Sequence, residues 1–310
     1  MYDIVGDVHG HASRLESLLR KLGYEHDGYS WKHDSRRVLF VGDFIDRGPE
    51  QIETYKLVRA MVDHGSALAV MGNHEFNAVC YATPDPRDIT NRLRPHTEKH
   101  MSQHAEFIRQ VGEGTSLHQE MINWFKTLPL YLDLDELRVI HACWEDNVIT
   151  AIDRMTDSNQ CLHEWAWQEA SRKSTEAYNA VETALKGLEI DLPGGARFID
   201  KGGFERRAIR TRWWSDRSST YRSIAMMDDQ ACAALPSEAD QIVPETELPG
   251  YQDTKLIFFG HYWLKGKPAP MSDRVACVDY TVTLPPPEGK LVAYRWSGES
   301  QIREDAFVWI

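Results

Sequence analysis

One pattern occurs five times in this chain and constrains its fold more than any other feature: a short apolar run that ends at Asp, Asn or His. The clearest example is Val38–Val41, a run typical of a buried strand, which Gly42 and Asp43 follow. The other four runs are Tyr2–Val5 before Asp7 and His9, Ala67–Met71 before Asn73, Leu137–Ile140 before His141, and Leu256–Phe259 before His261. A side chain at a strand end is held rigidly and can face a cleft, so the pattern predicts a shared metal site.

The side chains that follow these strands form one donor set: Asp7, His9, Asp43, Asn73, His141 and His261. Oxygen and imidazole donors without a thiolate suit borderline or hard divalent ions, here Mn first, with Fe, Zn, Co and Ni as alternatives. Six donors exceed what one tetrahedral ion needs. We therefore expect two divalent metal ions that share one bridging carboxylate.

Three motifs in this order, GDVHG at 6–10, GDFIDRG at 42–48 and GNHE at 72–75, resemble the calcineurin-like metallophosphoesterases and, within them, the phosphoprotein phosphatase branch. The resemblance is specific over residues 1–80, weaker at His141 and His261, and nearly absent over 145–250. It implies a four-layer α/β/β/α sandwich that hydrolyses phosphoesters with two metals. It also implies that Asp7 and His9 bind the first metal, that Asp43 bridges, and that Asn73, His141 and His261 bind the second.

The same resemblance implies the catalytic roles. His74 would be the general acid, because a histidine with an acidic partner such as Asp46 stays protonated and oriented. Arg47 would clamp the substrate phosphate with two parallel donors, next to Asn73 and His74. A second phosphate-binding arginine is expected in the later half of the chain, where Arg212 is the first choice and Arg210 the next. Asp279 resembles a further position near the site.

Hydrophobic periodicity predicts how these motifs are arranged. Helices are expected over 11–22 and 49–64, so residues 1–75 alternate strand and helix, which is typical of a largely parallel sheet. Hairpins are expected over 130–140 and between 274–282 and 290–296. We expect a single domain, 1–310, with a helical and loop insertion at about 145–250 over the active site, helical over 162–190 and a long loop over 226–250. An independently folding domain is the alternative for the insertion.

Residues 81–104 contain three prolines and three histidines at four-residue spacing, His96, His100 and His104. Since no strand end or acidic partner accompanies them, we expect a solvated loop and helix rim and not a metal site. The four Lys and Arg side chains of the segment suggest that it borders the substrate cleft and adds positive charge. Truncation of the segment should then change substrate preference.

Composition narrows the class of partner. The net charge is −12, from 35 basic and 47 acidic side chains, which disfavours broad binding to nucleic acid or to an anionic membrane. Five cysteines without a C-x-x-C pair indicate reduced thiols and a cytoplasmic setting, with Cys143 expected to be a buried structural thiol. Residue 2 already begins a predicted strand, so no signal peptide is expected, and no apolar run approaches the roughly 18 residues of a membrane span. Nothing in the sequence sets the oligomeric state.

Three functions remain open. The first is a metal-dependent phosphatase acting on phosphoproteins, at Ser/Thr or Tyr, or on small phosphoesters. The second is a symmetrical diadenosine tetraphosphate hydrolase, which the stretch Arg210-Thr211-Arg212-Trp213 resembles, although Asp46 and Glu75 resemble protein phosphatases more. The third is a catalytically silent binding protein that keeps the fold, against which the complete donor set argues.

Overall fold

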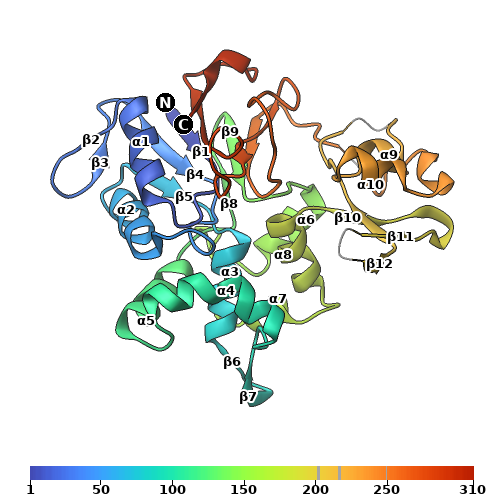
Figure 1. Cartoon of the computed structure of the whole chain (residues 1–310), viewed down its shortest axis with the longest axis horizontal. Coiled ribbons are helices and arrows are strands. Elements are labelled where there is room, and N and C mark those ends of the chain that lie inside the picture. Colours follow the sequence, from blue (N-terminus) through green and yellow to red (C-terminus); the bar gives the residue numbers. More distant parts are fainter. Residues whose placement is uncertain (201–202, 216–217, 249) are drawn as a thin grey trace.

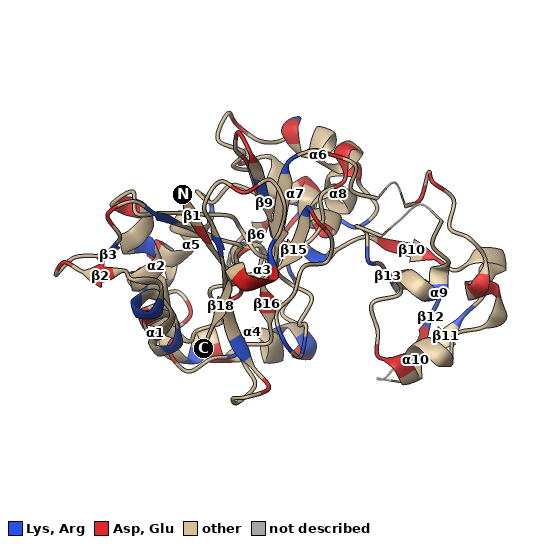
Figure 2. Ribbon diagram, turned by 90° about the horizontal axis from the view of Figure 1, so that it is seen from above, with Lys and Arg blue, Asp and Glu red and all other residues tan. Residues whose placement is uncertain are grey.

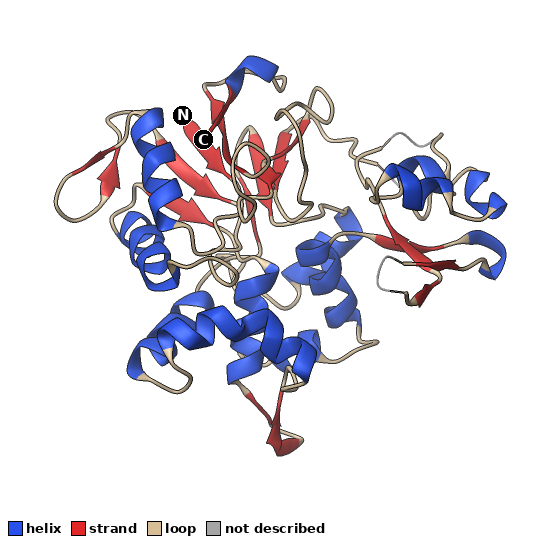
Figure 3. Ribbon diagram, in the orientation of Figure 1, coloured by secondary structure: helices blue, strands red, loops and turns tan. Residues whose placement is uncertain are grey.

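Two β-sheets packed face to face form the centre of the computed structural model, which describes residues 1–200, 203–215, 218–248 and 250–310 (Figure 1 and Figure 3). In the first sheet the neighbouring strands run in the order β16-β17-β1-β4-β5, and β18 pairs with β17. Their bounds are β1 Tyr2–Val5, β4 Arg37–Phe40, β5 Ala67–Ala69, β16 Asp279–Tyr280, β17 Lys290–Trp296 and β18 Phe307–Trp309. Strands β1, β4 and β5 are parallel, as the alternation of strand and helix predicts.

The second sheet has the order β15-β14-β9-β8. Its strands are β8 Tyr131–Asp133, β9 Leu137–Ile140, β14 Leu256–Phe259 and β15 Val275–Cys277. Strands β9, β14 and β15 are parallel, and β8 forms the expected hairpin with β9. The expected hairpin between 274–282 and 290–296 is divided: only β16 pairs with β17, while β15 lies in the other sheet. Val278, which is fully buried, lies between β15 and β16, and at this residue the chain passes from the second sheet to the first.

Alternating side chains explain how the sheets pack. In β1 the inward Ile4 belongs to the core between the sheets, together with Leu39, Val139 and Phe258, whereas the adjacent Val5 packs into the core under the helices. This period of two is expected for strands covered on both faces. The sandwich of the α/β metallophosphoesterase type is therefore confirmed, with the buried apolar runs predicted from the sequence at its centre.

Helices cover the sheets and extend below them in Figure 1. Helices α1 and α2 follow β1 and β4 with nearly the predicted bounds. The α-helices up to residue 186 are α1 Ala12–Leu22, α2 Gln51–Asp63, α3 Asn73–Ala82, α4 Glu98–Val111, α5 Ser116–Phe125, α6 Asp146–Asp153, α7 Ala166–Ser171 and α8 Glu176–Lys186. Two small hairpins connect them, β2 Glu25–His26 with β3 Trp31–Lys32, and β6 Pro84–Asp85 with β7 Asp88–Arg92.

The described residues between 188 and 248 form what we call the accessory unit. It consists of β10 Glu189–Asp191 paired with β13 Ala208–Arg210, β11 Phe198–Ile199 paired with β12 Glu205–Arg206, and the short helices α9 Tyr221–Ile224 and α10 Asp229–Ala233. It has its own buried cluster, which includes Ile190, Ile209 and Ile224, and it stands to one side of the sheets in Figure 2. Within the expected insertion at 145–250, the longer helices end at Lys186, and the part after this residue has only short helices. The expected loop over 226–250 holds α10, because Asp228 caps its first turn.

Two expectations from the sequence concern membrane-spanning helices and the state of the cysteines. No helix in the described ranges is both long enough and apolar enough to cross a membrane. All five cysteines are free thiols, and Cys143 is fully buried, as expected. The sequence 206–217, RRAIRTRWWSDR, is rich in basic and aromatic residues, and its last two residues, Asp216 and Arg217, lie outside the described residues.

Candidate metal centre

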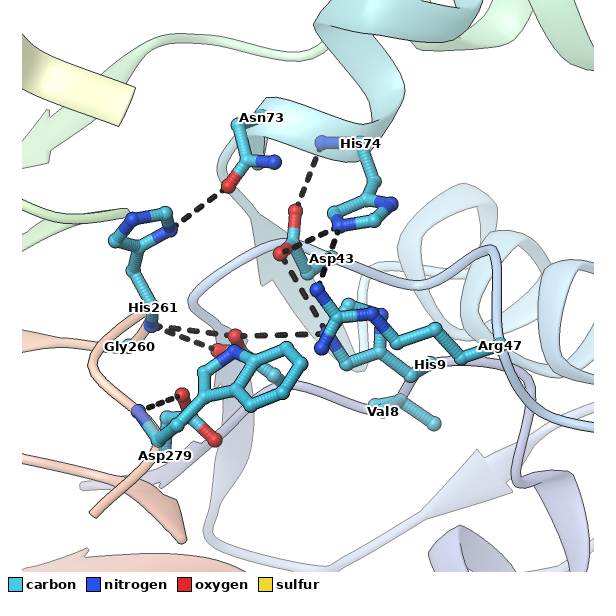
Figure 4. A network of polar contacts seen from close by, with 12 residues as sticks. Val8, His9, Asp43, Arg47, Asn73, His74, Gly260, His261 and Asp279 are labelled. Atoms are coloured by element: carbon cyan, nitrogen blue, oxygen red, sulfur yellow. Dashed lines mark hydrogen bonds and ion pairs between the residues drawn. The ribbon is translucent and has the colours of Figure 1, made fainter. Parts of the chain in front are cut away.

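All six strand-end side chains meet at one edge of the two sheets. Figure 4 labels four of them, His9, Asp43, Asn73 and His261. The first sheet supplies Asp7 and His9 after β1, Asp43 after β4 and Asn73 after β5. The second sheet supplies His141 directly after β9 and His261 after β14. The donors come from both layers because the carboxyl ends of the parallel strands of each sheet point to the same edge.

Asp43 lies between two groups of donors. One group is His9, Asp43 and His74, and the other is Asp43, His141 and His261; within each group the donor atoms lie within 4.8 Å of one another. The Oδ2 atom of Asp43 is 3.7 Å from Nε2 of His9 and 3.4 Å from Nε2 of His141. Asn73 adds its Oδ1 atom to the second group, 2.8 Å from Nδ1 of His261. Asp43 therefore occupies the position that a carboxylate bridging two metal ions requires.

The histidine rings are oriented for metal binding. Nδ1 of His9 bonds to the Ile45 carbonyl at 2.9 Å, and Nδ1 of His141 bonds to the Val41 carbonyl at 2.7 Å. A ring that donates its Nδ1 proton to a carbonyl leaves Nε2 as an acceptor. Nε2 of His9 is buried and has no hydrogen-bond partner. An orphaned buried imidazole nitrogen fits a metal ligand, since such an atom otherwise costs free energy.

Electrostatics favour a cation at this edge. Burial raises the pKa of Asp7 well above its usual value, and the neighbouring Asp279 and Asp43 carboxylates raise it further. Burial lowers the pKa of His141, but Asp43 outweighs this effect and raises that pKa to about 10. A divalent cation would compensate the carboxylates and displace the proton shared by His141 and Asp43. The donor set therefore fits divalent metal ions.

Backbone strain is concentrated at the same residues. Five non-glycine site residues have positive φ angles: His9 at 43°, Asp43 at 53°, Asp46 at 67°, Arg47 at 71° and His261 at 72°. Each such conformation costs about 1–3 kcal/mol and persists where the surrounding structure imposes it, often at functional sites. The strain therefore marks the same edge of the sheets as the donor set does.

The motif glycines allow the loops to approach closely. A Cβ atom at Gly72 would collide with the carboxylate of Asp43, and one at Gly260 would collide with the carboxylate of Asp7. The absence of a side chain at these two positions explains why glycine precedes Asn73 and His261 in the sequence.

His74 and Asp46 form a buried pair next to the donor set. Nδ1 of His74 is 2.5 Å from Oδ2 of Asp46, and Oδ1 of Asp46 is 2.8 Å from Nδ1 of His104. Burial lowers the pKa of His74, but Asp43 and Asp46 outweigh it, so this pKa is raised. Burial raises the pKa of Asp46, but His104 and His74 hold it below its usual range. Nε2 of His74 is left to face the centre, as a general acid requires.

His104 corrects the expectation for residues 81–104. Only 5% of its surface is exposed, and it packs against Phe107 while it binds Asp46. His96 and His100, in contrast, bond to nearby backbone carbonyls. Sequence reasoning missed His104 because its partner lies 58 residues away; its position on the buried face of α4, beside Phe107, was the available signal.

Glu75 was also missed as a structural residue. Its carboxylate accepts from the backbone N–H groups of Asp43, Phe44 and Gly72 at 2.8–3.0 Å, and so holds the loop that carries Asp43. Burial, together with Asp43, raises the pKa of Glu75 to about 7. Its place in GNHE, after Asn73 and His74, was the signal.

Arg47 lies over the centre, with Nη2 at 3.3 Å from Nε2 of His74 (Figure 4). Its guanidinium stacks on the indole of Trp263, 3.6 Å from the ring centroid. The backbone N–H of Trp263 in turn donates to Asp279 at 2.7 Å. Trp263 therefore holds Arg47, and Asp279 holds the loop after His261. No pattern in the sequence indicated this role of Trp263.

The structure brings Arg210, and not Arg212, to the centre. Nη1 of Arg210 is 3.3 Å from Nε2 of His261, and its Nη2 pairs with Glu189 at 3.2 Å. Arg212 is exposed, two residues beyond the end of β13. Side chains two residues apart lie on the same face of a strand, but β13 ends at Arg210, so Arg212 does not follow Arg210 towards the centre.

A pocket of about 830 Å³ opens beside the donor set. Arg47, His74 and Arg210 form its inner wall, and Arg94 and Lys99 from the segment 81–104 line it as well. The segment thus borders the site with basic side chains, as the sequence suggested.

Comparison with known proteins agrees with this geometry. A family model described as calcineurin-like phosphoesterase matches residues 2–262. The asymmetrical bis(5'-nucleosyl)-tetraphosphatase PrpE of Halalkalibacterium halodurans is 49% identical over 145 residues, which are 46% of this chain and 56% of that protein. PrpE of Geobacillus sp. strain WCH70 is 33% identical over 141 residues, 45% of this chain and 55% of that protein. The matches therefore span little more than half of the length of these relatives.

A solved structure shares the fold. The cold-active protein-tyrosine phosphatase of a psychrophilic Shewanella species has a TM-score of 0.50 at 15% sequence identity, over 94% of this chain and 74% of that chain.

Proposed function

This chain belongs to the calcineurin-like phosphoesterase family, and from that premise we propose that it hydrolyses phosphoesters or phosphoanhydrides at a dinuclear metal centre. One observation carries the proposal: the Asp43 carboxylate lies between two groups of donors, within reach of Nε2 of both His9 and His141. Asp7 and His9 would hold one ion, and Asn73, His141 and His261 the other. Manganese is the first candidate, with Fe, Zn, Co and Ni as alternatives. The ions would supply a water of lowered pKa and positive charge for phosphate oxygens.

Arg47 would orient the phosphate. Its guanidinium presents parallel donors to two oxygens, and the indole of Trp263 restricts its position, so little side-chain entropy is lost on binding. Arg210 would add a donor from the accessory unit, next to His261. Arg212, which is exposed, is not part of this proposal.

His74 would act on the leaving group. Water that has lost one proton to the solvent attacks phosphorus, the bond from phosphorus to the leaving oxygen breaks, and this oxygen takes the proton from Nε2 of His74, which the solvent then reprotonates. Asp46 holds the opposite nitrogen, Nδ1, and keeps the ring protonated and aimed. His104 fixes Asp46 through its second oxygen.

A dinucleoside polyphosphate is the first candidate substrate. The relatives in the comparison carry the name of asymmetrical bis(5'-nucleosyl)-tetraphosphatases, and their matched segments cover slightly less than half of this chain. These names favour cleavage of diadenosine tetraphosphate to ATP and AMP over symmetrical cleavage to two ADP. A phosphoprotein is the second candidate, because Asp46 in GDFIDRG and Glu75 in GNHE resemble protein phosphatases.

The test compares kcat/KM of the manganese-loaded protein on three substrates: diadenosine tetraphosphate, a phosphoserine/phosphothreonine peptide and a phosphotyrosine peptide. We expect the dinucleotide to lead by tenfold or more, with ATP and AMP as products. A phosphopeptide that leads by that margin would make the second candidate correct, and ADP as the only nucleotide product would show symmetrical cleavage. No turnover of any of the three, with metal bound, would contradict the proposed reaction.

A further inference from the structure

The pocket beside His74 is basic, although the chain as a whole is acidic. Its wall carries the side chains of six Lys and Arg residues and three Asp and Glu residues. The whole chain has 35 and 47, respectively. A cleft lined by one sign of charge concentrates ligands of the opposite sign. The ligand of this pocket is therefore an anion.

The three acidic side chains are already engaged. Asp46 binds His74 and His104, Glu106 pairs with Arg109 at 2.5 Å, and Glu182 pairs with Lys186. Among the described residues, no carboxylate lies within ion-pair distance of Arg94 or Lys99. The basic charge at this end of the pocket thus has no directly paired carboxylate among the described residues, and only more distant ones such as Glu182 act on Arg94.

Arg94 is held in place by neutral groups. Its Nη1 donates to Oδ1 of Asn77 at 2.9 Å, and its Nη2 donates to Oε1 of Gln103 at 2.8 Å. The backbone N–H of Arg94 donates to the Cys80 carbonyl at 3.0 Å. Burial lowers the pKa of this guanidinium. A partly desolvated charge that is fixed by amides and not by a carboxylate keeps its capacity to bind an anion.

Asn77 also sets the direction of Arg94 relative to the general acid. Asn77 follows His74 by three residues on α3, so the two side chains lie on the same face of the helix. Arg94, which bonds to Asn77, therefore lines the same pocket as His74, about one helical turn further along α3. Arg47 and Arg210 serve the scissile phosphate, and a substrate with one phosphate would leave Arg94 without an anion.

We propose that Arg94, assisted by Lys99, forms a second anion subsite that binds a phosphate beyond the scissile bond, and that the site accordingly prefers substrates with a polyphosphate chain. The subsite rests on the proposed function, because the scissile phosphate must lie at the metal centre. It selects the leaving group, whereas the metal donors and Arg47 serve any phosphoester.

The experiment measures how phosphate and pyrophosphate inhibit p-nitrophenyl phosphate hydrolysis by the manganese-loaded protein at a fixed excess of free Mn²⁺. We expect pyrophosphate to inhibit the unaltered protein at least tenfold more tightly than phosphate does. In Arg94→Gln this preference should fall by about tenfold, the loss expected for a charge-assisted pair of hydrogen bonds. Arg87→Gln is the matched control, because Arg87 is exposed, pairs with Asp85 and does not line the pocket; it should keep the full preference.

The proposal is overturned if the unaltered protein shows no preference for pyrophosphate, or if Arg94→Gln keeps it or weakens both inhibitors equally. Should Arg94→Gln lose its bound manganese or its folded structure, Lys99→Gln decides, because Lys99 is exposed and its loss should still reduce the preference about threefold. If diadenosine tetraphosphate is not cleaved but the preference depends on Arg94, the substrate proposal fails and the subsite stands. If p-nitrophenyl phosphate is not hydrolysed at all, the proposed function fails, and calorimetric binding of pyrophosphate to both proteins tests the subsite alone.

Discussion

The two sides of the candidate site are built differently. The metal side consists of side chains that follow strand ends; Asp7, His9, Asp43, Asn73 and His141 are buried, and His261 is partly buried. Backbone carbonyls fix the rings of His9 and His141. The pocket side consists of partly or fully exposed basic side chains from loops, helices and the accessory unit; they are Arg47, Arg94, Lys99, Lys173, Lys186 and Arg210.

The difference indicates a division of tasks. A metal site needs donor positions fixed within a fraction of an ångström, which strand ends in a packed core provide. Substrate choice needs charges whose placement can vary while the reaction stays the same, and loops and helix ends allow this. Changes on the metal side should therefore abolish the reaction, and changes on the pocket side should redirect it.

The largest effect is expected for Asp43→Asn. The amide removes the charge that both groups of donors share, so bound metal and activity should fall together, with kcat lower by at least about 10²–10³-fold. Metal content by elemental analysis and kcat on p-nitrophenyl phosphate check this. Asp34→Asn, an exposed aspartate, is the control and should change neither. Full metal content in Asp43→Asn would show that this residue does not bridge.

His74→Asn should lower kcat by about 10²–10⁴-fold for a substrate with a poor leaving group, such as phenyl phosphate. The loss should be smaller for p-nitrophenyl phosphate, whose leaving oxygen needs little protonation. Metal content should stay nearly unchanged, because the six strand-end side chains supply the proposed ligands and His74, although its Nε2 lies 3.9 Å from Oδ2 of Asp43, is not among them. Equal losses on both substrates, or loss of metal, would contradict the role of general acid.

Asp46→Asn should shift the pH dependence of kcat. Asp46 raises the pKa of His74, so its removal lowers that pKa, and the protonated acid is lost at a lower pH. The alkaline limb of the pH–rate profile should move to lower pH, and kcat at neutral pH should fall by about tenfold. The measurement is kcat from pH 5 to 10. An unchanged alkaline limb would assign that limb to another group.

Trp263→Leu should have the smallest effect. The indole, which is 42% exposed, stacks on Arg47, and an exposed contact of this kind contributes about 0.5–1 kcal/mol, so KM should rise by about 2- to 5-fold while kcat changes little. Trp165→Leu is the control, because this tryptophan is exposed and does not line the pocket. A kcat loss larger than the change in KM would show that Trp263 supports the chemistry and not only the position of Arg47.

The sequence predicted that the six strand-end side chains lie together, for a physical reason. Each of them follows an apolar run, so a local pattern identified both the strand and the side chain at its end; β9 and β14 have the predicted bounds. The pocket side follows no such local rule. His104 and Arg94 matter because of partners on other elements, and Arg210 takes the place expected for Arg212 because β13 ends at residue 210. Such pairings depend on tertiary packing, which a single sequence does not reveal.

The central claim is that the strand-end donors hold two metal ions, both of which the reaction requires. The most direct test is a titration of the chelated, metal-free protein with Mn²⁺, in which bound metal per chain and the rate of p-nitrophenyl phosphate hydrolysis are measured at each step. We predict no activity without metal and a full rate only when two ions are bound per chain. A full rate with one bound ion, or activity in the metal-free protein, would contradict this account.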